Sequence, residues 1–531
     1  MKPKVIPMLA AALVASGTAN AVSKDTKKPN ILIILADDLG FSDIGCFGGE
    51  IRTPNLDRLA EQGMRMTRMH SNPMSAPTRV SLLTGLTQTH GGIGNMGMAT
   101  TTPEYYDYMR HDCASLAETL QSAGYATAIS GKWHLGADDG ERPAQRGFER
   151  SFSMIGGAGD YWRPISVRLE DVPWKPDGPY YQTTAFSDKA VEYINASAGK
   201  PLFLYLAYNA PHWPLQAPQA EIDKYMDLYM QGWDATRAAR FEKQKRIGVI
   251  PRDAVLAPRD EKVDDWSSLD AAKQKKWCYK MAVYAAMVDI LDQGVGKVLT
   301  ALEKRGALDN TIIIFLADNG ACPFGASPYG PPAANKDDAT VAGSALKYDY
   351  PWANVSATPN YRYKRFTYRG GINVPCIVRY PKVVKAGSFS AVNTHVMDIM
   401  PTCLELASVP ALKTYKGQKM QPLDGVSLVQ TWRGSDKQVH EYLGWEHKGE
   451  CALLKGDWKI VYDYADDVKK WELYDLSRDG GVEVTNLADQ YPEKLRELEA
   501  DYARWKRDNK VIDIDEQKKL TKVKGKGGGD E

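Results

Sequence analysis

Two short acidic motifs each follow a run of apolar residues that is typical of a buried strand. Asp37-Asp38 follows the run 31–35, and Asp318-Asn319 follows the run 311–316. If the two strands are neighbours in a parallel sheet, their carboxyl ends bring three carboxylates and one amide oxygen together. These hard oxygen ligands, without thiolate or imidazole, suit a hard cation such as Ca²⁺ or Mg²⁺. Either pair alone is more often a turn, so the prediction depends on the repetition.

A serine that could act as a nucleophile lies between these motifs. Ser75 is followed by Pro77 and Arg79, and Thr84-Gly85 comes shortly after. The ordinary interpretation is the start of a helix, with Ser75 as the N-cap and Pro77 in the first turn. The alternative is that Ser75 takes part in chemistry. This segment by itself leaves both interpretations open.

Alternating strand and helix patterns must position these residues. Apolar runs predict strands at 31–35, 125–130, 202–207 and 311–316. A helix is predicted after Thr53-Pro54, with Leu56, Leu59, Met64 and Met66 at partial helical spacing, and further helices over 114–123 and 281–304. Strands that alternate with helices predict an α/β fold, in which a large, mostly parallel sheet is sandwiched by helices.

The pattern changes after about residue 433. Two short strands around a Gly-Asp turn are predicted over 453–461, a third strand over 471–476 and a helix over 492–508. We therefore expect a large domain over 22–435 and a smaller C-terminal α+β domain over 436–515 that contains a short antiparallel sheet. Residues 516–531 are rich in lysine and glycine and are expected to form a disordered tail.

The first 21 residues have the features of a secretory signal peptide. Lys2 and Lys4 precede an apolar run, and Ala19-Asn20-Ala21 is a small-residue cleavage site. The mature protein is therefore expected to be exported, to a periplasm or to the medium, after cleavage behind Ala21. No later run approaches the roughly 20 apolar residues that a transmembrane segment needs.

Composition and charge exclude several classes of protein. The 531 residues include 67 Lys and Arg against 66 Asp and Glu, and 43% are hydrophobic. This composition excludes collagen-like and disordered chains, and the balanced charge offers no basic surface for nucleic acid. The seven cysteines are widely scattered and lack the spacing of a metal site or of a disulfide framework.

Six motifs in a fixed order identify a known family. The sequence resembles the type I, formylglycine-dependent sulfatases of the alkaline phosphatase superfamily, in their arylsulfatase-like, serine-type form. The resemblance covers nearly the whole mature chain and rests on Asp37-Asp38, Ser75 to Gly85, Gly131-Lys132-Trp133-His134, Asn209-Ala210-Pro211-His212, Asp318-Asn319-Gly320 and Lys364 to Pro375, and it extends to Glu472-Leu473-Tyr474. It implies an alkaline phosphatase-like fold and a sulfuric ester hydrolase.

The resemblance implies a specific chemistry for Ser75. A serine-type maturase would oxidise this residue to formylglycine (3-oxoalanine) before export, and the aldehyde would be hydrated to a geminal diol. One hydroxyl would attack sulfur and release the alcohol. The other would then expel sulfate from the covalent adduct and restore the aldehyde, whereas an ordinary serine ester would need water to attack a very stable sulfate ester.

The same resemblance assigns the metal ligands and the groups that hold the diol. Asp37, Asp38, Asp318 and Asn319 would bind calcium, with residue 75 completing the shell. Arg79 and Lys132 would hold and polarise the diol.

Proton transfer is assigned to residues that follow other strands. His134 would take a proton as the adduct collapses, and His212 with Lys364 would bind the ester oxygens and protonate the leaving alcohol. A histidine is more often part of a core or loop, but both follow apolar strands at the edge that carries the metal motifs. The sequence departs from the family pattern near Lys364, because Arg369 precedes Gly370-Gly371 where an acid is usual, but the spacing to Gly370-Gly371 and Val374-Pro375 still favours Lys364. Arg365 or Lys347 could replace it.

The assigned groups together predict a pocket that binds an anion. Three aspartates, a divalent ion and three cations, Arg79, Lys132 and Lys364, sum to +2 when the histidines are neutral. A phosphate would fit the same charge, so a phosphomonoester or phosphonate hydrolase is one alternative. A non-catalytic binder of sulfated glycans is another, although an anion binder does not need two histidines for proton transfer.

The substrate is expected to be a sulfated carbohydrate, with small aryl sulfates also accepted. Aromatic residues that could stack on a sugar are Tyr161, Trp162, Trp213, Trp352 and Trp445, although most aromatic residues belong to a core. Glu446-His447 is a candidate contact from the small domain, and the ordinary interpretation is a surface loop. The stretch 321–363 lacks periodicity and is expected to form a wall of the substrate pocket.

Overall fold

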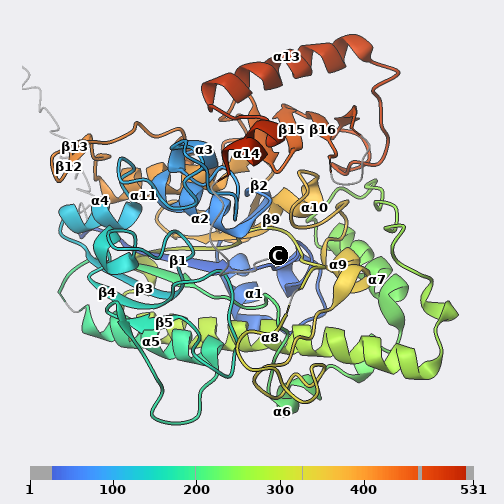
Figure 1. The fold of residues 1–531 in the computed structure, drawn as a ribbon, viewed down its shortest axis with the longest axis horizontal. Helices are drawn as coiled ribbons and strands as arrows, with labels where there is room; N and C mark the ends of the chain where they lie inside the picture. Colours follow the sequence, from blue (N-terminus) through green and yellow to red (C-terminus); the bar gives the residue numbers. More distant parts are fainter. Residues whose placement is uncertain (1–26, 198, 326, 465–468, 522–531) are drawn as a thin grey trace, which may run out of the picture.

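The computed structural model describes residues 27–197, 199–325, 327–464 and 469–521. Its central feature is an eleven-stranded sheet with helices on both faces (Figure 1). In order across the sheet, the strands are β10 (Ser388–Ser390), β2 (Met64–His70), β9 (Asn373–Arg379), β8 (Thr311–Ala317), β1 (Asn30–Ala36), β7 (Leu202–Ala207), β3 (Ala126–Lys132), β4 (Arg150–Met154), β5 (Val167–Leu169) and β6 (Val172–Pro173), and β11 (Thr394–His395) also pairs with β2.

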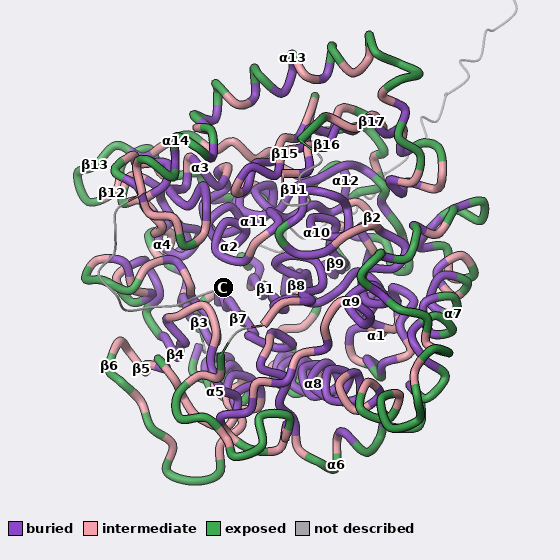
Figure 2. Tube along the Cα trace, turned by 45° about the vertical axis from the view of Figure 1, so that its right-hand side comes forward, coloured by how far each residue is buried: buried purple, intermediate pink, exposed green. Residues whose placement is uncertain are grey.

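The centre of this sheet is parallel and buried. β1 lies between β7 and β8, with Leu35 opposite Ala207 on one side and Leu316 on the other. These strands consist mostly of isoleucine, leucine and phenylalanine, as is typical of strands with helices on both faces. Figure 2 shows them within the buried interior. The strands that precede the two acidic motifs are therefore parallel neighbours, which is the condition on which the predicted metal site depends.

Helices cover both faces of the sheet. In Figure 1, α8 (Ala271–Lys304), α5 (Gln182–Ala196) and α1 (Pro54–Glu61) lie below the sheet, and α2 (Ser75–Thr84), α4 (Leu116–Ser122) and α11 (Ile399–Ala407) lie above it. Shorter or peripheral elements are α3 (Gln88–Gly91), α6 (Gln219–Ile222), α7 (Gly232–Arg246), α9 (Asp349–Ser356), α10 (Arg369–Ile372), α12 (Val429–Trp432) and the hairpin of β12 (Thr414–Tyr415) with β13 (Gln418–Lys419). The predicted α/β fold class is confirmed.

A second, antiparallel sheet lies near the C-terminus. It consists of β14 (Leu443–His447), β15 (Glu450–Lys455), β16 (Trp458–Tyr462) and β17 (Trp471–Asp475), beneath helix α13 (Pro492–Asp508) in Figure 1. One face packs on α13 through Leu453 and Ile460. The other packs on the large domain through Trp445 and Val461. Successive side chains of these strands therefore point alternately to α13 and to the large domain. The domain boundary at residues 435 and 436 stays a prediction.

The helix predicted after Pro54 is shorter than expected. α1 ends at Glu61, and Met64 and Met66 lie in strand β2. Gly63 lies between the two elements. Its backbone lies so close to β9 that an added Cβ would be 2.3 Å from the Val378 carbonyl oxygen. Burial alternates at the start of β2, which is the period of a strand and not of a helix.

Part of the segment predicted as a C-terminal tail is helical. Helix α14 (Ile514–Leu520) includes residues 516–520, which the sequence placed in the tail. Gln517 is buried, donates to the Ile512 carbonyl oxygen at 2.8 Å and also bonds to Asn95. The side-chain amide of Gln517 thus attaches this polar, lysine-rich segment to the large domain. Residues 522–531 and the predicted signal peptide, 1–21, lie outside the described residues. Within the described part of the chain, no helix is long and apolar enough to cross a membrane.

Gly131 allows β3 and β7 to approach each other beside Lys132. Its φ is 127°, and an added Cβ would lie 1.8 Å from the Ala207 carbonyl oxygen. We expect Gly131→Ala to lower the free energy of unfolding by about 3 kcal/mol, measured by urea denaturation, because the strands must move apart. Gly124→Ala is the matched control: its φ is 87° but nothing lies within 4 Å. It should cost about 1 kcal/mol, and equal losses would contradict the crowding argument.

Candidate active site

The two acidic motifs meet at the carboxyl edge of the large sheet. Asp37 and Asp38 follow β1, and Asp318 and Asn319 follow β8; all four are buried. The Asp38 amide donates to Asp318 Oδ1 at 3.2 Å, and Asn319 Nδ2 donates to Asp38 Oδ1 at 2.7 Å. The structure therefore brings together the three carboxylates and the amide that the sequence selected.

The backbone at this edge is held by bonds between neighbouring strand ends. The Asp318 amide donates to the Ala36 carbonyl oxygen at 3.0 Å, and the Asp37 amide donates to the Ala210 carbonyl oxygen at 3.0 Å. Asp38 has a φ of 63°, which is uncommon for a residue with a side chain and typical of strained functional positions.

Ser75 lies at the start of α2 and points to the acidic cluster. Its hydroxyl donates to Asp318 Oδ2 at 2.6 Å and accepts from Arg79 Nε at 2.9 Å. Arg79 is one helical turn further on, and its Nη2 also donates to Asp318 Oδ2 at 2.9 Å. The N-cap residue is Met74, and no side chain caps the helix. Ser75 is thus not the ordinary helix cap that was the alternative interpretation.

Two lysines reach the aspartates from other segments. Lys132, the last residue of β3, places Nζ 2.6 Å from Asp37 Oδ2. Lys364 Nζ lies 2.8 Å from Asp38 Oδ1. Of the two alternatives to Lys364, Arg365 is exposed, and Lys347 pairs with Asp349 at 3.0 Å. Among these three residues, the geometry places Lys364 in the cluster.

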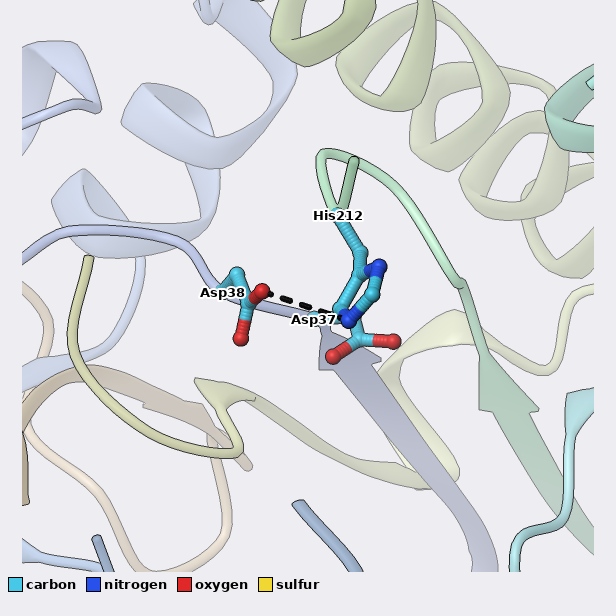
Figure 3. A group of neighbouring side chains, drawn as sticks. All are labelled: Asp37, Asp38 and His212. Atoms are coloured by element: carbon cyan, nitrogen blue, oxygen red, sulfur yellow. Dashed lines mark ion pairs between the residues drawn. The ribbon is translucent and has the colours of Figure 1, made fainter. Parts of the chain in front are cut away.

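His212 lies against Asp37 and Asp38 in the loop after β7 (Figure 3). Its Nε2 is 3.5 Å from Asp38 Oδ2, and its Nδ1 is 2.6 Å from the Trp213 carbonyl oxygen, which makes Nδ1 the donor. Burial lowers the pKa of His212 to about 3, against the opposing charge of Asp38. The ring is therefore neutral near pH 7, and we interpret its approach to Asp38 as a contact without an ion pair.

His134 follows β3 at the same edge, two residues after Lys132. Its Nδ1 is buried and has no hydrogen-bond partner among the described residues. Burial, together with the charges of Lys132 and Arg79, lowers its pKa well below the ordinary value. A neutral imidazole in this position can accept a proton. Its φ is 56°, so it is a second residue with a left-handed backbone in the site.

The carboxylates have different environments. Burial raises the pKa of Asp38, but the charge of Lys364 and the hydrogen bonds from Lys364 and Asn319 outweigh this effect and leave the pKa below the ordinary value. For Asp318, burial and the charge of Asp37 raise the pKa. Lys364 has a raised pKa because Asp38 outweighs the effect of burial. The lysine therefore keeps its proton at neutral pH.

The cluster has the donor set of a divalent hard cation. Asp37 Oδ1 and Asn319 Oδ1 are buried oxygens without a hydrogen-bond partner among the described residues. Asp37, Asp38 and His212 also offer ligand atoms that lie within 4.8 Å of one another. Oxygens that lack a donor and lie among carboxylates are the groups that bind calcium or magnesium. The residues present therefore fit a bound cation.

The loop that carries Lys364 is fixed by close backbone packing. The Lys364 amide donates to the Ala321 carbonyl oxygen at 3.0 Å, just after the second acidic motif. An added Cβ on Gly320 would lie 1.8 Å from the Gly370 carbonyl oxygen. Gly320 and the double glycine both lie in motifs of the sequence, but the contact between them could be found only from the structure.

The structure places the candidate substrate contacts in different environments, some partly exposed and some buried. Trp213 is partly exposed and stacks on Tyr329 at 5.2 Å and on His212 at 5.4 Å. Three of the other aromatic candidates are buried, and their polar groups donate to backbone carbonyl oxygens: Tyr161, Trp352 and Trp445. Their role as pocket walls stays a prediction. Trp162 is partly exposed. His447 is buried on the face of β14 that meets the large domain.

Glu446 does not lie in a surface loop and does not face the cluster. It is a β14 residue, it is buried, and its carboxylate accepts from the Gly449 amide at 3.0 Å. Strand alternation turns it toward α13, and the charges that act on it come from that side, including Lys506. The structure therefore argues against the predicted substrate contact of Glu446.

Family profiles and curated relatives agree with this arrangement. The profile named Sulfatase matches residues 29–409, and the one named N-sulphoglucosamine sulphohydrolase, C-terminal, matches residues 360–505. An uncharacterised sulfatase of Schizosaccharomyces pombe is 37% identical, with 89% of this chain and 92% of that protein covered. An arylsulfatase of Klebsiella aerogenes is 35% identical, with 79% and 95% covered.

A solved structure shares the fold at lower identity. The protein i-CgsB, solved with a neocarrahexaose, superposes with a TM-score of 0.66 at 24% identity and covers 91% of this chain and 94% of its own. The ordered strand-end motifs, the Sulfatase profile over most of the chain and relatives above a third identity lead to one conclusion. The chain belongs to the sulfatase family and is a sulfuric ester hydrolase.

Proposed function

We propose that the protein hydrolyses a sulfate monoester of a carbohydrate, with a formylglycine made from Ser75 as the nucleophile and a bound Ca²⁺. The observation that carries the proposal is the position of the Ser75 hydroxyl. It lies between Arg79 Nε at 2.9 Å and Asp318 Oδ2 at 2.6 Å, at the point where the acidic motifs meet. A structural serine would not need both a buried cation and a buried carboxylate on one oxygen.

A formylglycine at position 75 would supply a hydrated aldehyde with two hydroxyl groups. Arg79 would orient the oxygen that replaces the serine hydroxyl, since its Nε already donates to that position. Lys132, which lies on Asp37, would add positive charge on the same side. These two cations would stabilise the negative charge that develops on the sulfate oxygens.

The remaining residues would handle protons. His134, neutral and with an unpartnered Nδ1, is suited to accept one. Lys364 keeps its proton at neutral pH and would donate a hydrogen bond to the leaving oxygen, while the neutral His212 would contact the same ester. The assignment follows a general rule, in which neighbouring groups with pKa values pushed apart act as acid and base.

Asp37, Asp38, Asp318 and Asn319 would hold the calcium ion, together with the oxygen at position 75. The ion would supply two positive charges for binding the sulfate group. Three carboxylates favour Ca²⁺, because Mg²⁺ usually keeps several waters and is held by only one or two carboxylates.

A sulfated carbohydrate is supported as the substrate class by relatives with printed substrates. An N-acetylglucosamine-6-O-sulfatase of Bacteroides thetaiotaomicron is 28% identical over 93% of this chain and 89% of its own length. The stack of His212, Trp213 and Tyr329 offers an aromatic surface beside the site. We further propose export after cleavage behind Ala21, and modification of Ser75 by a serine-type maturase before export.

Mass spectrometry of the peptide that contains residue 75 tests the modification. In protein produced together with a serine-type maturase, we expect this peptide to lose two hydrogens relative to the gene-encoded sequence. Protein made without the maturase is the control and should retain serine and release little sulfate. An unmodified residue 75 in active enzyme would show that the formylglycine assignment is wrong.

A further inference from the structure

His447 is a buried histidine whose two ring nitrogens both lack a partner. Its exposed fraction is 0%, and both ring nitrogens are buried without a hydrogen-bond partner among the described residues. A buried polar group without a partner destabilises the folded protein. Such a group needs an explanation, and a ligand that bonds to it is one.

β14 turns His447 toward the segment that leads to the nucleophile. Trp445 and His447 lie on the same face of the strand because side chains alternate. Trp445 Nε1 donates to the Ser71 carbonyl oxygen at 2.9 Å, four residues before Ser75. The next amide after His447, that of Lys448, donates to Asn95 Oδ1 at 2.8 Å and fixes the end of the strand.

Arg365 reaches the same segment from the loop of Lys364. Its amide donates to the Pro73 carbonyl oxygen at 2.7 Å, and its φ is 83°. Its side chain is exposed and makes no ion pair with the described residues. Lys364 is buried on Asp38, so the chain passes from the buried site to solvent between these two adjacent residues.

The positive charges of Arg365 and Lys364 lie close enough to His447 to act on its imidazole. Burial lowers the pKa of His447 well below its ordinary value, and the charges of Lys448, Arg365 and Lys364 add to this effect. The burial of His447 does not separate it from the reaction. Ser75 is 1% exposed and Lys132 is 0% exposed, and the substrate must meet both of them under the proposed function.

We propose that His447 and Arg365 form a subsite for the leaving group, in which Arg365 pairs with a second anionic substituent of the substrate. This inference rests on the proposed function. A neutral imidazole both donates and accepts, which suits a sugar hydroxyl. A guanidinium binds a sulfate or a carboxylate with two parallel hydrogen bonds. The preferred substrate is therefore a sulfated sugar that carries another negative charge, either a second sulfate or a uronate carboxylate.

Kinetics with matched esters test the subsite. The substrates are 4-nitrophenyl sulfate, a monosulfated hexosamine, a disulfated hexosamine and a monosulfated disaccharide that contains a uronate. The unaltered enzyme should prefer at least one of the two dianionic esters over the monosulfated sugar about tenfold in kcat/KM, mainly through KM. The ester with the greater preference identifies the second anion as sulfate or carboxylate.

Variants locate the preference at these residues. Arg365→Gln should lower kcat/KM on the preferred ester about tenfold more than on 4-nitrophenyl sulfate, and Arg365→Lys should recover part of the loss because it keeps the charge. His447→Gln should lower kcat/KM on the sugar esters more than on 4-nitrophenyl sulfate. Arg433→Gln changes an exposed arginine just after α12 and should leave all four substrates unaffected.

Three results would overturn the subsite: no preference for either dianionic ester, equal losses on all substrates, or equal effects of Arg365→Gln and Arg433→Gln. Turnover of 4-nitrophenyl sulfate tests the proposed function separately, so activity without a preference would reject the subsite alone. If no ester is hydrolysed, calorimetry with the disulfated hexosamine decides. Arg365→Gln should weaken its binding about tenfold, and unchanged binding would reject the subsite.

Discussion

Replacing Ser75 with alanine is expected to abolish sulfate release while the fold survives. Alanine cannot be converted to formylglycine and offers no oxygen between Arg79 and Asp318. Loss of a nucleophile typically costs a hydrolase about 10⁴-fold or more in kcat, so the residual rate should fall to background. Sulfate release is measured by ion chromatography with protein made alongside a maturase.

Stability separates a chemical role of Ser75 from a structural one. Arg79 Nη2 lies 2.9 Å from Asp318 Oδ2 in a direct ion pair that does not involve the hydroxyl, so the pair should keep its charge compensation in the variant. We expect Ser75→Ala to change the free energy of unfolding by only about 1 kcal/mol. Ser81→Ala is the matched control, because Ser81 is buried in the same helix and its hydroxyl accepts from Asn72 Nδ2 at 3.0 Å.

The control variant should lose a similar amount of stability and keep its activity. If Ser75→Ala retains turnover, the nucleophile assignment is refuted. If both variants lose activity together with their folded signal in circular dichroism, the losses come from the helix and not from the missing oxygen.

The acidic site could be predicted because its position follows from strand ends. The site was predicted on the condition that the apolar runs before Asp37 and Asp318 form neighbouring parallel strands, and β1 and β8 are such neighbours. Lys132, His134 and His212 follow from the same rule, since β3 and β7 end at that edge. Side chains placed directly after buried parallel strands have little freedom in where they lie.

Residues that depend on the contact between the two sheets could not be predicted. Glu446 and His447 are adjacent in sequence, yet strand alternation sends one toward α13 and the other toward the large domain. The sequence does not show strand β14, because Leu443–His447 is short and mixes apolar and charged residues. The choice between Lys364 and Arg365 was also left open, because both residues are basic and adjacent in sequence. The backbone bonds of Lys364 to Ala321 and of Arg365 to Pro73 distinguish them.

The buried charges of the site balance in pairs. Lys132 lies 2.6 Å from Asp37, Arg79 lies 2.9 Å from Asp318, and Lys364 lies 2.8 Å from Asp38. Removing one partner from a buried pair typically costs about 3 to 5 kcal/mol, because a charge is left uncompensated. Since every aspartate has a cationic partner within the protein, the fold should not depend on a bound metal ion for charge neutrality.

Removal of divalent cations is therefore expected to stop the reaction without unfolding the protein. After chelation and dialysis, sulfate release should fall more than about 100-fold, because charge stabilisation at the sulfate oxygens is lost. The folded signal in circular dichroism should persist, with a lower midpoint of thermal unfolding, since a bound ion stabilises the folded state by mass action. Calcium should restore the rate fully and magnesium partly, with metal content followed by mass spectrometry.

A pair of asparagine variants links the ion to the acidic cluster. Asn319→Ala removes a buried Oδ1 without a partner in the described residues, and should weaken calcium binding at least about tenfold in direct titration. Asn393→Ala is the matched control, because Asn393 is also buried, also has an unpartnered Oδ1 and donates to the Gly456 carbonyl oxygen at 2.9 Å. Equal calcium affinity in both variants, or full activity restored by zinc alone, would contradict a hard-cation site at the ends of β1 and β8.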